Sequence, residues 1–210
     1  MTSSLTDLLT ESRQLGFLGP GPVEAHISHA VAFAAAVPVI PARALDLGAG
    51  GGLPGLVLAS SMWMGTQWTF LDAQLRRTDF LLRASSALGL HERVTVVNGR
   101  AEEVGRDIDH RAGYDLVVAR SFAAPPVAAE CAAPLLRVGG WLVVSEPPAT
   151  ALAMRWPSEG LSQVGFGAAE AVDTVDDDGE PVHLIRVQLL TLPDDRFPRR
   201  VGVPAKRPIF

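Results

Sequence analysis

The residues best suited to chemistry form one glycine-rich run, Asp46-Leu-Gly-Ala-Gly-Gly-Gly-Leu-Pro-Gly55. It lies between a segment typical of a buried strand and an apolar segment typical of a helix, so it joins strand to helix. Glycines in such a turn let a ligand approach the backbone closely and permit positive φ angles. The carboxylate of Asp46 can orient the turn and attract the ammonium group of a methionine-like moiety. The run therefore predicts a cofactor site at a strand end, with candidate contacts at Asp46, Gly48, Ala49, Gly50 and Gly52.

Two classes of cofactor fit this turn. Gly50, Gly52 and Gly55 satisfy the G-x-G-x-x-G pattern of dinucleotide-binding proteins. Dinucleotide turns usually have an apolar strand running into the first glycine, whereas here Asp46 intervenes, which favours S-adenosylmethionine. Asp72, at the end of the next predicted strand, can hydrogen-bond two ribose hydroxyls of either cofactor and does not discriminate between them. A tight turn that binds no ligand is the third alternative.

The rest of the chain alternates between strand and helix patterns. Strands are predicted at residues 43–47, 68–71, 94–97, 114–119, 141–145, 165–173 and 183–190. Helices are predicted at about residues 1–20, 22–37, 56–64, 75–88 and 127–136. This alternation indicates an α/β, Rossmann-like fold: a mostly parallel seven-stranded sheet with helices on both faces and a C-terminal antiparallel hairpin.

The chain is long enough for a single domain, and its charge is unevenly distributed. Its 210 residues carry a net charge of −5. Residues 196–210 hold five basic residues and no acidic one, which leaves about −10 for the remainder. We expect an N-terminal helical segment at 1–40 packed on the core, a cofactor-binding Rossmann-like part at 41–195 and a basic C-terminal tail at 196–210. The tail either contacts phosphates or is solvated.

Several classes of protein are disfavoured by the composition. The longest apolar stretch, residues 30–42, is interrupted by two prolines and is too short to span a membrane. The N-terminus lacks the pattern of a signal peptide, so we expect a cytoplasmic protein. Cys131 is the only cysteine, which excludes an internal disulfide, and we expect it in the core. His26 and His29 have no further ligands in view, so no metal site is predicted.

Five motifs, in order along the chain, resemble the RsmG/GidB family, the bacterial methyltransferases that act on guanine N7 in 16S, small-subunit ribosomal RNA. The glycine run with its Leu-Pro-Gly ending is similar to the turn of that family. The other four motifs are Leu71-Asp72 followed by Arg76-Arg77 and Phe80-Leu81, Gly99 to Glu103, Val118 to Ala123, and Phe197 to Lys206.

The resemblance implies a class I methyltransferase that uses S-adenosylmethionine, and a role in rRNA processing. It implies cofactor contacts at Gly48, Leu53, Ala101, Glu102 and Arg120. Its RNA-contact candidates are His26, Arg199, Arg200 and Lys206, with ribosomal RNA or the small ribosomal subunit as the partner. For His26, packing on the helix is the alternative role.

Guanine N7 has a free lone pair and no proton to remove, so its methylation needs orientation rather than a general base. Arg120 is the one catalytic candidate, because it could bind the cofactor carboxylate or an RNA phosphate. The chain departs from the family in its short N-terminal region and in Ser145-Glu146, which stand where many members have Lys-Gly. Glu146 would repel phosphate. A paralogous methyltransferase with another substrate and a non-catalytic protein that binds S-adenosylmethionine are therefore the alternatives.

Overall fold

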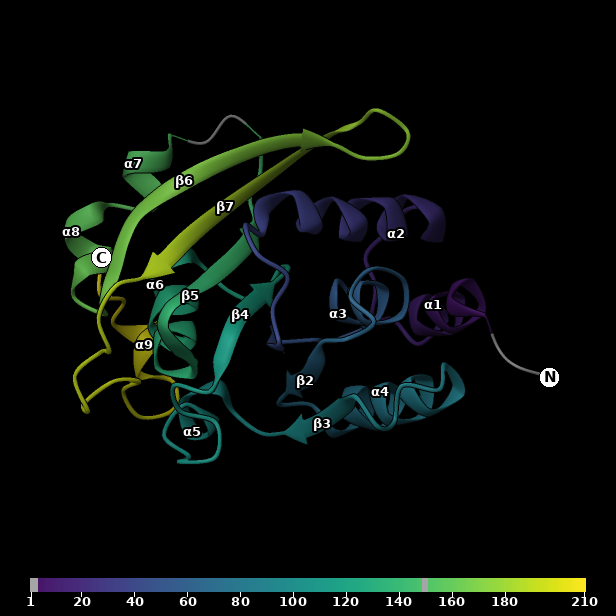
Figure 1. Ribbon diagram of the computed structural model, residues 1–210, viewed down its shortest axis with the longest axis horizontal. Coiled ribbons are helices and arrows are strands. Elements are labelled where there is room, and N and C mark those ends of the chain that lie inside the picture. Colours follow the sequence, from purple (N-terminus) through teal and green to yellow (C-terminus); the bar gives the residue numbers. More distant parts are fainter. Residues whose placement is uncertain (1–3, 149–150) are drawn as a thin grey trace.

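The computed structural model describes residues 4–148 and 151–210, and a seven-stranded sheet forms its centre (Figure 1). The strands lie in the order β3-β2-β1-β4-β5-β7-β6. The first five are parallel, whereas β7 is antiparallel to both of its neighbours. Their bounds are β1 Arg43–Leu47, β2 Gln67–Asp72, β3 Val94–Asn98, β4 Tyr114–Ala119, β5 Leu136–Ser145, β6 Phe166–Val175 and β7 Pro181–Leu189. The predicted sheet and its closing hairpin are confirmed.

Helices cover both faces of this sheet, as predicted. They are α1 Leu5–Gln14, α2 Val23–Ala32, α3 Gly55–Val57, α4 Leu75–Ala87, α5 Ala101–Val104, α6 Pro125–Ala132, α7 Leu152–Arg155, α8 Ser158–Ser162 and α9 Val203–Lys206. Neighbouring strand residues contribute to opposite cores: Val117 packs with α6, whereas Val118 packs with α4. This alternation explains why the central strands are apolar throughout, since both of their faces are buried.

The start of β5 differs from the prediction. The expected helix at 127–136 ends earlier, because a short 3₁₀ turn containing Pro134 follows α6 and the chain is extended from Leu136. Gly139, at φ +85°, and an irregularity in the pairing with β4 then bring Trp141 into register. The short helices α5, α7, α8 and α9 were not predicted, because segments of four or five residues show too little periodicity.

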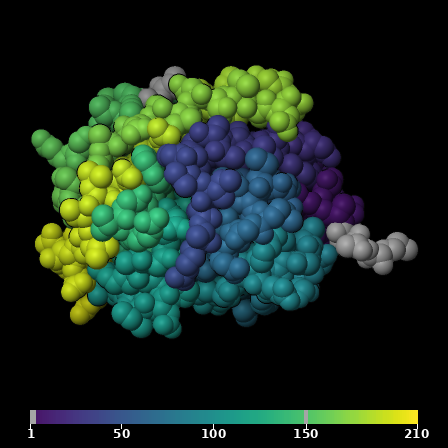
Figure 2. Space-filling view, viewed as in Figure 1, coloured from purple at the N-terminus to yellow at the C-terminus, as the bar shows by residue number. Residues whose placement is uncertain are grey.

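Both ends of the described chain pack against the sheet domain. In α1, Leu8 and Leu9 are buried, and the Ser12 hydroxyl donates to the Gly51 carbonyl at 3.0 Å. At the other end Phe197 is buried. Figure 2 shows α1 in purple and the C-terminal segment in yellow on opposite sides of this face. The division at residues 40 and 195 remains a prediction, and these contacts support its single-domain form.

The described residues contain neither a membrane-spanning helix nor a cluster of metal-ligating side chains. No helix among them is long and apolar enough to cross a membrane. Nor do they contain a group of three or more His, Cys, Asp or Glu side chains placed to hold a metal ion.

Candidate functional site

The glycine turn is held by backbone hydrogen bonds at the carboxyl ends of β1 and β2. The Gly48 and Ala49 N–H groups both donate to the Leu71 carbonyl, at 2.8 and 2.9 Å. Gly48 has φ +73°, and a Cβ atom there would lie 2.6 Å from the Phe122 ring. Gly48 must therefore be glycine for two reasons, its conformation and the approach of Phe122.

Asp46 lies beneath the turn. It is fully buried, and its Oδ2 accepts a hydrogen bond from the Gly55 N–H at 2.7 Å. Burial raises its pKa to about 7. Neither Asp46 nor Gly52 lines any of the three cavities described below. The hydrogen bond to Gly55 is the contact by which Asp46 can orient the turn, and its contact with a cofactor ammonium group stays a prediction.

Asp72 is placed where it could bind a ribose. Its side chain is almost buried, and its two oxygens accept from the Gln74 N–H at 2.8 Å and the Gly50 N–H at 3.0 Å. Arg77 lies 3.6 Å from the same carboxylate. Asp72 lines a cavity of about 360 Å³, here called the β2 cavity, together with Gly48, Ala101 and Glu102 among others. Three residues predicted to contact the cofactor are therefore brought together with Asp72.

A second, smaller cavity of about 200 Å³ follows the glycine turn itself and is called the turn cavity. Its lining includes Ala49, Gly50, Leu53, His26 and Arg120, all of which were predicted site residues. The β2 and turn cavities share Gly48, Arg77 and Ser121. The two adjoining cavities are together called the recess. It lies at the carboxyl ends of β1, β2 and β4, where a nucleoside with an amino-acid tail could lie across both.

Arg120 and His26 form a pair between the turn and α2. The Arg120 guanidinium donates to His26 Nδ1 at 2.9 Å, so the ring proton lies on Nε2, which is 3.2 Å from the Gly19 carbonyl. The second terminal nitrogen of Arg120 is buried and has no hydrogen-bond partner among the described residues. His26 therefore holds one terminal nitrogen of Arg120 in place, and the other terminal nitrogen can still donate a hydrogen bond to a ligand.

A third cavity of about 390 Å³ opens beyond β4 and is called the β5 cavity. Arg120, Ser121 and Phe122 form its border with the other two cavities, and Glu146, Arg155 and Trp156 line it elsewhere. Glu146 is 7% exposed and accepts from Arg155 Nε at 2.5 Å. His29 also lines this cavity, and burial lowers its pKa to about 4.

Ser121 was missed by the sequence reasoning, although it lines all three cavities. It has φ +55°, which is rare for a residue with a side chain and is concentrated at functional sites. Ser121 directly follows Arg120 in the family motif Val118 to Ala123, and this position could have identified it. Trp156 offers no comparable pattern in the sequence.

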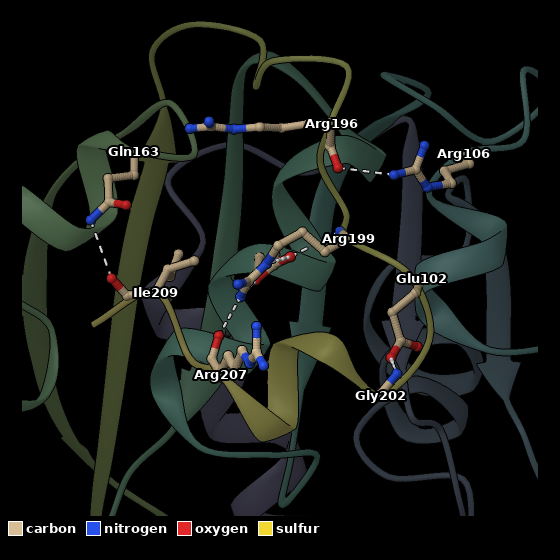
Figure 3. Close-up of polar contacts among 9 residues, drawn as sticks. Glu102, Arg106, Gln163, Arg196, Arg199, Gly202, Arg207 and Ile209 are labelled. Carbon is tan, nitrogen blue, oxygen red and sulfur yellow. Dashed lines mark hydrogen bonds and ion pairs between the residues drawn. The ribbon is translucent and has the colours of Figure 1, made fainter.

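Two residues of the basic C-terminal segment line the β2 cavity, and polar contacts hold this segment against the rest of the domain (Figure 3). Gly202 and Ala205 line that cavity, and the Gly202 N–H donates to Glu102 Oε1 at 2.9 Å. Arg199, predicted to contact RNA, instead donates to fully buried Glu130 at 2.8 and 2.5 Å. Its guanidinium is engaged within the protein, a placement that does not support a phosphate contact.

Further contacts anchor the same segment. The Arg106 guanidinium donates to the Arg196 carbonyl at 2.9 Å, and Arg199 donates to the Arg207 carbonyl at 2.7 Å (Figure 3). Arg200 and Lys206 are exposed and lie outside the three cavities, so they remain available to a partner. The segment is thus a folded part of the domain, and four of its cations, Arg196, Arg200, Lys206 and Arg207, are exposed.

Comparisons with known proteins show the family of the chain. Residues 21–146 match the GidB family model, described as rRNA small subunit methyltransferase G. Among curated relatives named ribosomal RNA small subunit methyltransferase G, that of Deinococcus deserti is 38% identical over 169 residues, covering 80% of this chain and 68% of the relative. That of Deinococcus radiodurans is 39% identical over 170 residues, covering 80% and 66%. The chain thus spans about two thirds of the length of these relatives.

Solved structures show the same fold at lower identity. The O-methyltransferase TomG from Streptomyces achromogenes, in complex with SAM, matches with TM-score 0.60 and 17% identity over 90% of this chain and 92% of its own. TYW2 from Pyrococcus horikoshii, in complex with MeSAdo, matches with TM-score 0.60 and 15% identity over 83% and 66%. The family match, carried by sequence, is the more specific result: the chain belongs to the GidB family of rRNA small subunit methyltransferases.

Proposed function

We propose that the chain transfers the methyl group of S-adenosylmethionine to N7 of a guanine in small-subunit ribosomal RNA. The carrying observation is the recess formed by the adjoining β2 and turn cavities, with Asp72 at one strand end and Arg120 at another. Membership of the GidB family supports the reaction and the RNA class. The N7 position comes from the family resemblance described above.

The residues of the recess fit this cofactor. Asp72 is an acceptor for two ribose hydroxyls, and Ala101 and Glu102 surround the place for an adenine ring. The turn cavity, bordered by Gly50 and Arg120, would take the amino-acid end, with the free guanidinium nitrogen of Arg120 as donor to its carboxylate. When bound, S-adenosylmethionine supplies an activated methyl group.

The chain's own residues then need only to position the acceptor. Guanine N7 carries a lone pair and no proton, so no side chain has to remove one. Arg120 lies on the border between the recess and the β5 cavity, held by His26, and Ser121 and Phe122 complete that border. The β5 cavity is where the acceptor base would lie, within reach of that border. Exposed Arg200 and Lys206 would bind phosphates outside it.

The test is a methyl-transfer assay with labelled S-adenosylmethionine on unmodified small ribosomal subunits and on naked small-subunit rRNA, followed by mapping of the modified base. We expect one guanine to be methylated at N7. Transfer to a different molecule would favour the paralogous enzyme, and cofactor binding without transfer would favour a non-catalytic protein. We expect the reaction in the cytoplasm, where its substrate is made.

A further inference from the structure

The β5 cavity is lined by polar groups that the proposed reaction does not use. Glu146 lies in its wall with its side chain 7% exposed, paired with Arg155. The indole N–H of Trp156, a residue that is 2% exposed, has no hydrogen-bond partner among the described residues. The same holds for His29 Nδ1. Unsatisfied buried polar groups that converge on one cavity indicate a polar ligand.

The arrangement of these groups gives the cavity two ends. Arg120, Ser121 and Phe122 form the end that borders the cofactor recess. Glu146, Arg155 and Trp156 line the β5 cavity without lining that recess. A purine that presents N7 to the border must direct its opposite, Watson–Crick edge away from it. For guanine that edge carries two adjacent donors, the N1–H and the N2 amino group, and a carboxylate offers two adjacent acceptors.

We propose that Glu146 recognises the Watson–Crick edge of guanine in the β5 cavity, an inference that rests on the proposed function. The carboxylate accepts hydrogen bonds from N1–H and from the N2 amino group while N7 faces Arg120 and Ser121. Adenine is rejected because its N1 is an acceptor, which would place a lone pair against a buried negative charge. Glu146, which would repel a phosphate, is thereby the specificity-determining residue for the base.

Arg155 makes this recognition possible by fixing the carboxylate. Its Nε and one terminal nitrogen donate to the two different Glu146 oxygens, at 2.5 and 3.3 Å. Each carboxylate oxygen has a further lone pair, so both can accept from a base at the same time. The ion pair also offsets the cost of burying Glu146 in the absence of substrate. Arg155 is therefore a positioning residue in this account.

The test measures binding of GMP and AMP to the protein loaded with S-adenosylhomocysteine, by calorimetry, independently of methyl transfer. For the wild-type chain we expect saturable GMP binding at least about tenfold tighter than AMP binding. In Glu146→Gln this preference should disappear, because the amide presents a donor to adenine N1 and loses an acceptor for guanine. S-adenosylhomocysteine affinity should stay unchanged.

Controls separate recognition from folding. Glu170→Gln breaks a comparable Glu–Arg pair at the surface, where Glu170 is 50% exposed, and should keep the GMP preference. If Glu146→Gln does not fold, Glu146→Asp keeps the charge and should retain a reduced preference. Absence of GMP binding, equal GMP and AMP affinity in the wild type, or a preference that survives in Glu146→Gln would overturn the proposal. If the wild-type chain prefers GMP but transfers no methyl group to rRNA, the proposed function is wrong while the recognition of guanine by Glu146 stands.

Discussion

Two regions far apart in the sequence line the same β2 cavity, and they are built in different ways. The glycine turn contributes Gly48, in a backbone conformation that is fixed by residues 46–55 and the adjacent end of β2. The C-terminal segment contributes Gly202 and Ala205, which are held in place by contacts of Arg199 and Gly202 with residues 69 and 100 positions away. The glycine turn could be recognised in the sequence because its geometry is local. Arg199 was misinterpreted as an RNA contact because its position depends on Glu130, a partner distant in the sequence.

The largest expected effect comes from breaking the buried ion pair between Arg199 and Glu130, which anchors the C-terminal segment. Arg199→Met leaves the fully buried Glu130 carboxylate without its guanidinium, and we expect the free energy of unfolding to fall by about 3 kcal/mol. Cofactor affinity should fall with it, because Gly202 and Ala205 lose their anchor. Denaturant unfolding and calorimetry with S-adenosylhomocysteine measure the two effects.

Arg186→Met is the matched control, because its partner Glu170 is half exposed. It should lower the free energy of unfolding by less than about 1 kcal/mol and leave cofactor affinity unchanged. Equal, small losses in the two variants would show that the C-terminal segment is not held by its buried pair.

On the turn side, Asp46 makes stability depend on pH. Its pKa is raised from 3.8 to about 7 by burial, so the folded state favours the protonated carboxyl. The stabilisation is full below about pH 4 and is lost as the pH rises towards 7, by about 3 kcal/mol. Asp46→Asn keeps an acceptor for the Gly55 N–H and does not titrate. The difference in unfolding free energy between variant and wild type should therefore grow from pH 4 to pH 7, and parallel curves would contradict this account of the turn.

A substitution at Asp72 tests whether the β2 cavity, which both regions line, binds the ribose of the cofactor. In Asp72→Asn the charge beside Arg77 and one ribose acceptor are lost, and we expect affinity for S-adenosylmethionine to fall about tenfold. Calorimetric titration measures this change. Asp79→Asn, on the exposed side of α4, is the control and should bind the cofactor like the wild type. An unchanged affinity in Asp72→Asn would place the ribose elsewhere.

The smallest expected effect concerns Arg200 and Lys206, which are exposed, whereas Arg199 is paired with Glu130. Replacing Arg200 and Lys206 together by alanine should weaken binding to small-subunit rRNA several-fold and reduce the slope of log affinity against log salt by about two. Cofactor affinity should not change. Filter binding at several salt concentrations measures the slope, and a slope equal to that of the wild type would show that neither Arg200 nor Lys206 contacts RNA phosphates.

Much of the fold and part of the site could be predicted from the sequence. The strand pattern, the glycine run and Asp72 depend on periodicity and on residues close together in the chain, which the sequence displays directly. The family motifs added Ala101, Glu102 and Arg120, which the structure places at the cavities.

The remaining features depend on partners distant in sequence. Charge composition alone could not show that Arg199 meets Glu130, nor that His26 supports Arg120 across 94 positions. Glu146 likewise could be interpreted only as a charge that repels phosphate until Arg155 and the β5 cavity were seen beside it.

Hydrogen–deuterium exchange with and without S-adenosylmethionine tests most directly whether the two regions enclose one cofactor. The account predicts that binding slows exchange at the amides of Gly48 to Gly52 and also at those of Gly202 to Lys206, with little change in the distant hairpin of β6 and β7. Protection confined to the glycine turn, or none in either region, would contradict it.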